Sequence, residues 1–494
     1  MNRITNFIKS GRACYLHLIS VFFVLHGYTE NYPIISVKDA GLLLLIYLAA
    51  GLVLFGLSWL IIRNRIRAHL FATCLMAIQF FFGAFIDFLR IQFPGSLFSS
   101  YTFILPFLMI ALITLLLLLR KSSRIFSQLK VYLSVLFLLL IVTDLVLLVY
   151  KSLSQDPTPV AATGNIQVCK DCPKPDIYLI IADGYPGLKS LRDNFNMDNT
   201  PFLDSLRKRG FHIVDSSHSN YNFTPFSVSS MLDMNFLTGI KGRNSDKSDM
   251  AVCYTTIKNS HTFRILSAYG YELFNYSIFD FKGQPSLAKP TFLPSRTSLI
   301  TAQTFTARLT KEVGFHLVTT LHLERFIRFV RMYDLDNNNL LKKETQQQVR
   351  VKSKAPKFVY THLVMPHYPY YYDSSGQANP YTLLDDKYRS NKNAFISYLH
   401  YSNRQLLGLV DDIRKNAITP PVILLMSDHG FREFPGPVAP SYYFYNLNAI
   451  LLPDSNYSLF YTGMSNINQF SALFNTLFNQ QLPLRKDSTS ELKD

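Results

Sequence analysis

Five apolar stretches in the first third of the chain constrain its fold more than any other sequence feature. Each approaches the roughly 20 residues that an α-helix needs to cross the hydrocarbon core of a bilayer. Residues 1–150 are therefore predicted to form a domain of five transmembrane helices. The first stretch is the shortest and carries His17 and His26; a signal peptide is the alternative, but no small-residue cleavage site follows Leu25. The stretches cover residues 13–28, 41–62, 70–89, 102–119 and 131–150.

Basic residues in the short loops predict the orientation, because cytoplasmic loops carry an excess of lysine and arginine. The only basic residues in the loops after the first and third stretches are Lys38 and Arg90. We therefore expect a multi-pass protein of the cell inner (plasma) membrane with a cytoplasmic N-terminus. Everything after Tyr150 then lies in the periplasm or outside the cell. The composition, rich in aromatic residues, asparagine and lysine and with a C-x-x-C pair, favours a periplasm. The basic residues expected in the cytoplasm are Arg3, Lys9, Arg12, Arg63, Arg65, Arg67, Arg120, Lys121, Arg124 and Lys130.

Two acidic residues lie within these stretches, where a charged side chain is costly unless it is paired. Asp87 has Arg90 nearby as a candidate partner, and Asp144 lies in the fifth stretch. We expect these residues to hold helices together or to lie at the membrane interface. A groove for a lipid head group is the alternative.

Residues 151–175 read as a linker, because they hold five residues of proline or glycine and lack periodicity. Within them Cys169 and Cys172 form a C-x-x-C pair. A redox pair and half of a zinc site are alternatives, but the chain has no second C-x-x-C. We expect a small structural disulfide in an oxidising compartment.

Residues 176–494 are predicted to form an extracytoplasmic catalytic domain. Apolar runs typical of strands alternate with amphipathic stretches typical of helices, which predicts an α/β sandwich with a mostly parallel central sheet. About 320 residues suffice to bury a full core. The strand-like runs are 177–182, 271–279, 357–365, 422–427 and 447–452, and the clearest helical stretches are 200–209 and 394–415.

Two of these runs end in residues that bind metals. Asp183 follows the run 177–182 and precedes Gly184, while Asp428 and His429 follow the run 422–427. In an open α/β sheet, ligands bind beyond the carboxyl ends of the strands. We therefore expect these three side chains to meet in one site. Carboxylate and imidazole ligands suit zinc or manganese.

Two further segments carry candidate catalytic groups. Thr224 precedes Pro225, which fits the first turn of a helix with Thr224 as its cap. A hydroxyl there faces the partial positive charge of the helix, and a metal would activate it as a nucleophile. His367 lies in a loop bounded by prolines and is predicted to bind an anion or protonate a leaving group. His362, still within a strand, reads as a core histidine.

At these four segments the chain resembles the sulfatase-like branch of the alkaline phosphatase superfamily. With five spans and an outward catalytic domain it is similar to lipoteichoic-acid synthases and phosphoethanolamine transferases. The resemblance implies that Asp183, Thr224, Asp428 and His429 bind one divalent metal and that Thr224 becomes phosphorylated. It also implies that His367 contacts the transferred group. The candidate substrate-binding residues are His367, Asn222 and Ser227.

Departures from the family pattern narrow the chemistry. No cysteine stands in place of Thr224 and no arginine follows it at the sulfatase spacing, so sulfate-ester cleavage is not expected. Sulfatases carry paired aspartates after the first strand, whereas Gly184 follows Asp183 here. No Asp-x-x-x-His stands in a convincing place for a two-metal site, so one metal ion, zinc or manganese, is predicted.

The predicted function is therefore the transfer of a phosphoryl-linked head group, of the phosphoethanolamine or phosphoglycerol type. The donor is a membrane lipid and the acceptor an envelope glycolipid or glycan. The alternatives are a phosphodiesterase or phosphatase with the same site, and an inactive binding protein in envelope assembly. Much of the excess of basic residues behind the net charge of +16 lies beside the apolar stretches, so no nucleic-acid partner is predicted.

Overall fold

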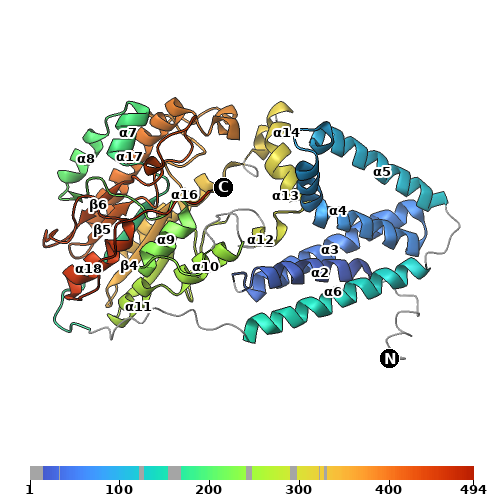
Figure 1. The fold of residues 1–494 in the computed structure, drawn as a ribbon, viewed down its shortest axis with the longest axis horizontal. Helices are drawn as coiled ribbons and strands as arrows, with labels where there is room; N and C mark the ends of the chain where they lie inside the picture. The colour runs from blue at the N-terminus through green and yellow to red at the C-terminus, as the bar shows by residue number, and fades with distance from the viewer. Residues whose placement is uncertain are drawn as a thin grey trace. The chain divides into compact units, whose positions relative to one another are not determined.

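The computed structural model describes residues 15–32, 34–121, 127–153, 168–240, 247–289, 297–321, 323–327 and 331–493. The chain divides into two compact units. The first, here called the helical unit, comprises residues 1–159 and 291–320. The second comprises residues 160–290 and 321–494 and is here called the catalytic unit, because it contains most of the domain predicted above to be catalytic. A segment that follows the third strand in the chain thus belongs to the helical unit (Figure 1).

The helical unit differs from the predicted domain of five spans. Among the described residues, four helices are long and apolar enough to cross a membrane: α3, α4, α5 and most of α6. The first predicted span is α2, a helix of 16 residues. At 1.5 Å per residue its described part extends about 24 Å. The helices are α2 (Tyr15–Glu30), α3 (Val37–Ile62), α4 (Arg65–Gln92), α5 (Tyr101–Lys121) and α6 (Ser127–Leu153).

The acidic residue on α4 is paired, but not with the predicted partner. Asp87 forms an ion pair with Arg308, and Arg90 forms one with Glu312 at 2.7 Å. Arg308 also contacts Glu312 at 2.8 Å, so the four charges form one network. Both new partners lie in the segment 291–320, which the sequence did not associate with the helices. Its short helices are α12 (Ser298–Thr301), α13 (Phe305–Leu309) and α14 (Phe315–Thr320).

Asp144, the acidic residue on α6, links this helix to α2. This is one of the two roles predicted for it. Asp144 is buried, and its Oδ1 lies 3.0 Å from Nδ1 of His26 on α2. Lys151, further along α6, donates to the carbonyl oxygen of Thr29 at 2.8 Å. Polar contacts of this kind compensate for placing charged groups among apolar helices.

The catalytic unit is built on a six-stranded sheet with the order β2-β6-β5-β1-β4-β3. Strands β3, β4, β1 and β5 pair in parallel, whereas β6 is antiparallel to both β5 and β2. The sheet is therefore mixed, and the expectation of a mostly parallel sheet was wrong at this edge. The strands are β1 (Ile177–Ala182), β2 (His212–Ile213), β3 (Glu272–Tyr276), β4 (Lys357–Leu363), β5 (Val422–Met426) and β6 (Asn448–Leu451).

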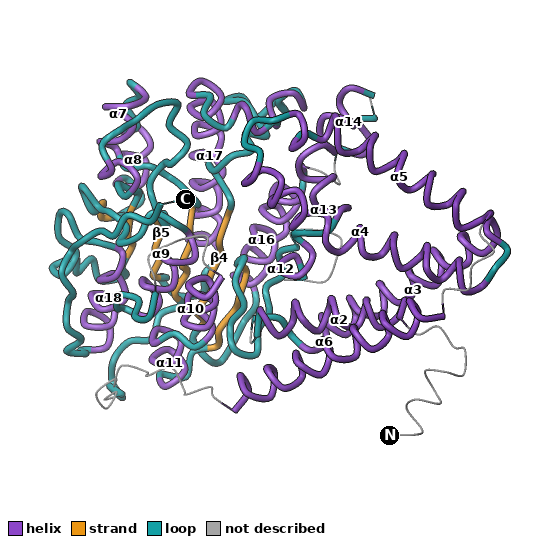
Figure 2. The backbone as a smooth tube through the Cα atoms, turned by 45° about the vertical axis from the view of Figure 1, so that its right-hand side comes forward, coloured by secondary structure: helices purple, strands orange, loops and turns teal. Residues whose placement is uncertain are grey.

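Helices cover both faces of this sheet (Figure 2). Alternate residues of β1, β4 and β5 pack with α9, α11 and α18 in one large apolar core. The two helices predicted at 200–209 and 394–415 are α8 and α17. The helices are α7 (Leu188–Phe195), α8 (Thr200–Arg207), α9 (Thr224–Asp233), α10 (Lys247–Lys258), α11 (His261–Ala268), α16 (Tyr333–Arg350), α17 (Lys392–Asn416) and α18 (Gln469–Phe478).

The predicted linker is only partly described. Its first residues continue α6 to Leu153, and residues 154–167 lie outside the described part of the chain. Cys169 and Cys172 form the expected disulfide, at the start of the catalytic unit. The disulfide closes a small loop just before β1.

Replacing Arg308 should destabilise the helical unit. The Arg308→Gln variant leaves Asp87 and Glu312 without their shared cation, at an expected cost of about 1–3 kcal/mol after allowing for the partial exposure of both carboxylates. Thermal unfolding of the full chain in detergent measures this. Lys311→Gln, at an exposed position on the same segment, is the control. Equal melting temperatures for the two variants would contradict the structural role of the network.

Candidate metal and nucleophile site

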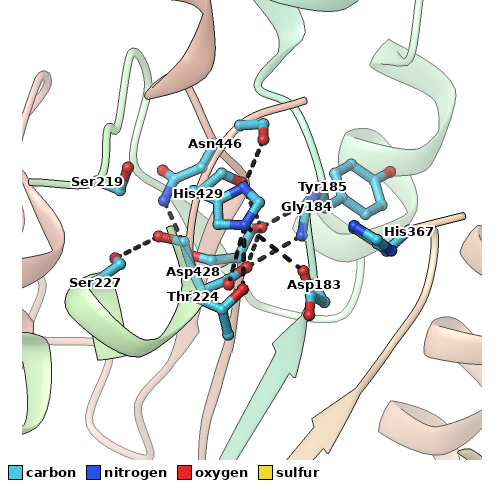
Figure 3. Close-up of polar contacts among 12 residues, drawn as sticks. Asp183, Gly184, Tyr185, Ser219, Thr224, Ser227, His367, Asp428, His429 and Asn446 are labelled. Atoms are coloured by element: carbon cyan, nitrogen blue, oxygen red, sulfur yellow. Dashed lines mark hydrogen bonds and ion pairs between the residues drawn. The ribbon is translucent and has the colours of Figure 1, made fainter. Parts of the chain in front are cut away.

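Two neighbouring parallel strands bring the predicted metal ligands together. Strands β1 and β5 pair in register, with Ile181 opposite Met426, so both end at the same edge of the sheet. Asp183 and Asp428 follow directly, and the Gly184 amide donates to Oδ1 of Asp428 at 3.0 Å (Figure 3). The prediction that these two strand ends meet is confirmed.

His429 and Thr224 complete the group. Nε2 of His429 lies 3.8 Å from Oδ1 of Asp183 and 3.4 Å from Oδ2 of Asp428. The hydroxyl oxygen of Thr224 lies 3.2 Å from the same nitrogen. The four residues come from β1, α9 and β5, and their polar atoms point toward one another (Figure 3).

The charges and orientations in this group fit a bound cation. Asp183 and Asp428 are 5% and 0% exposed, and within the described residues Oδ1 of Asp183 and Oδ2 of Asp428 have no hydrogen-bond partner. The other oxygen of each carboxylate is hydrogen-bonded, Oδ1 of Asp428 to the Gly184 amide and Oδ2 of Asp183 to His362. Burying the two remaining oxygens is costly unless a cation lies between them. Nδ1 of His429 donates to the carbonyl of Gly430 at 2.7 Å. Its Nε2 lone pair is thus directed at the carboxylates, as in metal-binding histidines.

The backbone around Asp428 is held rigidly. Asn446 and Asn466 both donate to the carbonyl oxygen of Ser427, at 2.8 and 2.9 Å. The Ser227 hydroxyl donates to the carbonyl oxygen of Asp428 at 2.5 Å. The turn that carries the ligands is therefore fixed by side chains from three separate segments, which favours a preorganised site.

Thr224 lies one position further into its helix than the sequence suggested. Phe223 is the N-cap residue of α9, and Thr224 is the first helical residue, followed by Pro225. The expectation that Thr224 itself caps the helix was wrong. The contact of its hydroxyl is with Nε2 of His429. A phosphoryl group next to it would also meet the free amides of the helix N-terminus.

Two residues proposed to bind substrate have other partners. The Ser227 hydroxyl is used by the Asp428 carbonyl, and Ser227 is buried. Asn222 binds the backbone of Leu492, donating to its carbonyl at 3.1 Å and accepting from its amide at 2.9 Å. Ser227 and Asn222 therefore stabilise the backbone around the site, and the structure does not bring Asn222 to the metal ligands.

His362 is a residue of the site that the sequence analysis assigned to the core. It is fully buried on β4, and its Nε2 lies 3.4 Å from Oδ2 of Asp183 while its Nδ1 lies 3.0 Å from the Tyr360 hydroxyl. Asp183, His362 and Asp428 offer ligand atoms within 4.8 Å of one another. The signal that would have found it is register, because β4 pairs with β1 and places His362 opposite Ile181, two residues before Asp183.

His367 lies beside this group. A Cβ atom on Gly184, whose φ of +66° favours glycine, would lie 3.5 Å from Cδ2 of His367 and 3.7 Å from Cε1 of His429. Nδ1 of His367 donates to the carbonyl of Tyr368 at 2.6 Å. Nε2 is therefore the ring nitrogen left to exchange a proton, and the neighbouring Cδ2 lies toward Gly184.

The electrostatics of the site favour a cationic His367 and an anionic Asp183. Burial alone would raise the pKa of Asp183, but its hydrogen bond with His362 and the charges of His367 and His429 hold it well below its usual range. Burial alone would lower the pKa of His367, but the negative charge of Asp183 outweighs it and the pKa is raised.

Charged residues missed by the sequence analysis surround these groups. Asp334, at the start of α16, and Glu433 both act to raise the pKa of His367. Burial raises the pKa of Asp334 itself, although the nearby charge of His367 acts to lower it. Arg432 stacks over the ring of Phe223 with its guanidinium carbon 3.3 Å from the ring centre. No pattern in the sequence marked these positions, since each depends on loops that fold back to the sheet edge.

No protein-family model matches the chain, and no curated protein matches it. Solved structures with a similar fold include the C-terminal periplasmic domain of EcEptC from Escherichia coli in complex with Zn, at 14% identity and a TM-score of 0.39, covering 65% of this chain and 88% of that one. The integral membrane protein lipooligosaccharide phosphoethanolamine transferase A from Neisseria meningitidis is 12% identical with a TM-score of 0.39, and 97% of each chain is covered.

A phosphonate monoester hydrolase of Agrobacterium radiobacter is similar at 14% identity with a TM-score of 0.37, covering 62% of this chain and 74% of that one. Phosphoethanolamine transferases, to which the sequence motifs pointed, are thus among the similar structures. Because these identities and TM-scores are low, the function proposed below rests on the geometry of the site.

Removing one carboxylate should abolish tight metal binding. In Asp428→Asn the buried pair loses one of its two charges, and the affinity for zinc or manganese is expected to fall about tenfold or more. Metal content after dialysis, measured by mass spectrometry of the element, reports this without an activity assay. Asp411→Asn, which removes a surface carboxylate paired with Arg209, is the control. Retention of full metal content in Asp428→Asn would contradict the assigned site.

Proposed function

We propose that the protein is a metal-dependent enzyme that transfers a phosphoryl-linked group through a covalent intermediate on Thr224. The observation that carries this proposal is the position of the Thr224 hydroxyl, 3.2 Å from His429 and at a helix N-terminus. It faces two buried carboxylate oxygens that have no hydrogen-bond partner among the described residues. Such a hydroxyl is set up as a nucleophile rather than as a structural cap.

The side chains divide the work of one transfer between them. A divalent metal held by Asp183, Asp428, His429 and Thr224 would supply charge stabilisation for the attacking oxygen and the phosphoryl oxygens. The hydroxyl proton of Thr224 would pass to water when the site takes up its cation, so that the Thr224 oxygen begins and ends each cycle as an alkoxide. This oxygen forms a bond to phosphorus, while the bond from phosphorus to the leaving ester oxygen breaks. His367, which is positioned to donate a proton, protonates that oxygen.

The second half of the reaction regenerates the enzyme. An acceptor hydroxyl forms a new bond to phosphorus as the bond to the Thr224 oxygen breaks, and His367 takes the proton of the acceptor. The free amides at the start of α9 bind the phosphoryl oxygens in both halves. With water in place of the acceptor, the same steps describe a phosphodiesterase or phosphatase.

The helical unit suggests the source of the donor. It contains four helices able to cross a membrane, and attachment to a bilayer raises the effective concentration of a lipid donor. We infer a lipid head group of the phosphoethanolamine or phosphoglycerol type as the group transferred, and an envelope glycolipid or glycan as acceptor. The catalytic unit would then face the periplasm or the cell exterior, as the basic loops predict.

Thr224→Ala should prevent formation of the covalent intermediate. Intact-mass analysis of the full chain, incubated with zinc or manganese and a mixed phospholipid extract, is expected to show a mass increment in the wild type and none in the variant. Thr200→Ala is a matched control, since Thr200 also begins a helix and also precedes a proline. Undiminished turnover in Thr224→Ala would refute the nucleophile, and a product larger than the free head-group alcohol would identify a transferase.

His367→Gln should slow the reaction in a way that depends on the leaving group. Loss of a general acid typically costs about 10²–10⁴-fold in kcat for an alcohol leaving group. An ester of 4-nitrophenol, whose anion leaves without a proton, should be affected far less. Kinetics with the two kinds of substrate measure the difference, with the exposed His400→Gln as control. An equal loss with both substrates would show that His367 does not protonate the leaving group.

A further inference from the structure

Residues 482–492 lie across the catalytic unit and are held there by asparagine side chains. A primary amide offers one acceptor and a pair of donors, so a single asparagine can bind both the N–H and the C=O of one backbone residue. Three asparagines do this along the segment, each donating to a carbonyl and accepting from an amide. They are Asn475 on Leu482 (2.9 and 2.8 Å), Asn468 on Arg485 (2.9 and 2.7 Å) and Asn222 on Leu492 (3.1 and 2.9 Å).

The last of these contacts is made next to the proposed nucleophile. Asn222 precedes Thr224 by two residues and is 4% exposed. Asn220 adds two hydrogen bonds to the same segment: its carbonyl accepts from the Ser490 amide at 2.8 Å, and its side chain donates to the Ser488 carbonyl at 2.9 Å. The chain that leads into α9 is therefore held along its length by residues 488–492.

Apolar packing reinforces these hydrogen bonds. Leu492 is 3% exposed and belongs to a small core cluster with Tyr221, Phe226 and Cys253. Phe226 lies in the first turn of α9, so Leu492 contacts the same turn whose first residue is Thr224. The N-cap residue Phe223 makes no side-chain capping bond, which leaves the start of the helix dependent on such outside contacts.

We propose that residues 485–492 act as a positioning strap for the nucleophile, with Asn222 as the residue that transmits its hold to Thr224. The inference rests on the proposed role of Thr224 and adds a residue that acts through it. A displacement of a reacting group by about 1 Å can cost about 100-fold in rate. Release of the strap should therefore lower kcat while substrate and metal contacts made by Asp183, Asp428 and His429 persist.

The chain supplies a matched control for this test. Asn475→Ala removes the same pair of hydrogen bonds as Asn222→Ala, but from Leu482 and without contact to the segment before Thr224. With bis(4-nitrophenyl) phosphate and zinc, Asn222→Ala is expected to lose about 10- to 100-fold in kcat with little change in KM. Asn475→Ala is expected to keep the wild-type kcat, while both variants show a similar fall in melting temperature.

The contact can also be broken from the other side. Leu492→Pro removes the amide that donates to Asn222, and Leu482→Pro does the same to Asn475. Leu492→Pro also removes the buried Leu492 side chain, so its kcat should be at least as low as that of Asn222→Ala, and the double variant should lose no more than Leu492→Pro alone. Asn222→Leu, which has a similar volume and no polar group, should show the same loss of kcat and covers the case in which the alanine variant fails to fold.

Hydrogen exchange separates failure of the strap from failure of the proposed function. In Asn222→Ala the amides of residues 221–224, 226 and 227 should exchange about tenfold faster than in Asn475→Ala, as expected for a lost pair of hydrogen bonds. If the wild type is inactive and Thr224 carries no phosphoryl group, the proposed function fails and exchange alone decides the strap. Equal kcat and equal exchange in the two variants overturn the strap.

Discussion

Two buried carboxylates, each with one oxygen that accepts no hydrogen bond from the described residues, are the constraint on which this edge of the catalytic unit depends. They meet because β1 and β5 pair in parallel and end at the same edge of the sheet. Hydrogen bonds from Gly184 and Tyr185 join the two strand ends. Burying the two unbonded oxygens is costly, and a cation between them would relieve this cost. Metal binding and folding of this edge are therefore expected to be linked.

The parts of the site that follow a strand were readable from the sequence. One buried apolar run is followed by Asp183, and another by Asp428 and His429. Each pattern can be recognised from a few consecutive residues. Parallel pairing then determines where they meet, and the structure confirms it. The helix start at Thr224 was readable as well, although the cap is Phe223 and the threonine is the first helical residue.

What the sequence did not reveal depends on contacts between distant segments. Asn222 looked like a substrate ligand because it flanks Thr224, yet its partner is Leu492, 270 residues away in the chain. Asp87 looked like a partner of Arg90, yet Arg308 lies closer in space. The direction of β6 could not be read from its apolar residues, since the same composition serves a parallel and an antiparallel edge. Each of these depends on tertiary structure that no local pattern encodes.

The division of the chain into its two units has a consequence for how firmly they are joined. The polypeptide passes between the units three times, near residues 159, 290 and 320. A protease that cuts once within the linker before β1 would leave a fragment whose segment 291–320 is still packed among the helices of the other fragment. The catalytic unit would then remain attached to the helical unit after such a cut, in contrast to a domain that is connected by a single linker. Its retention is built into the order of the chain.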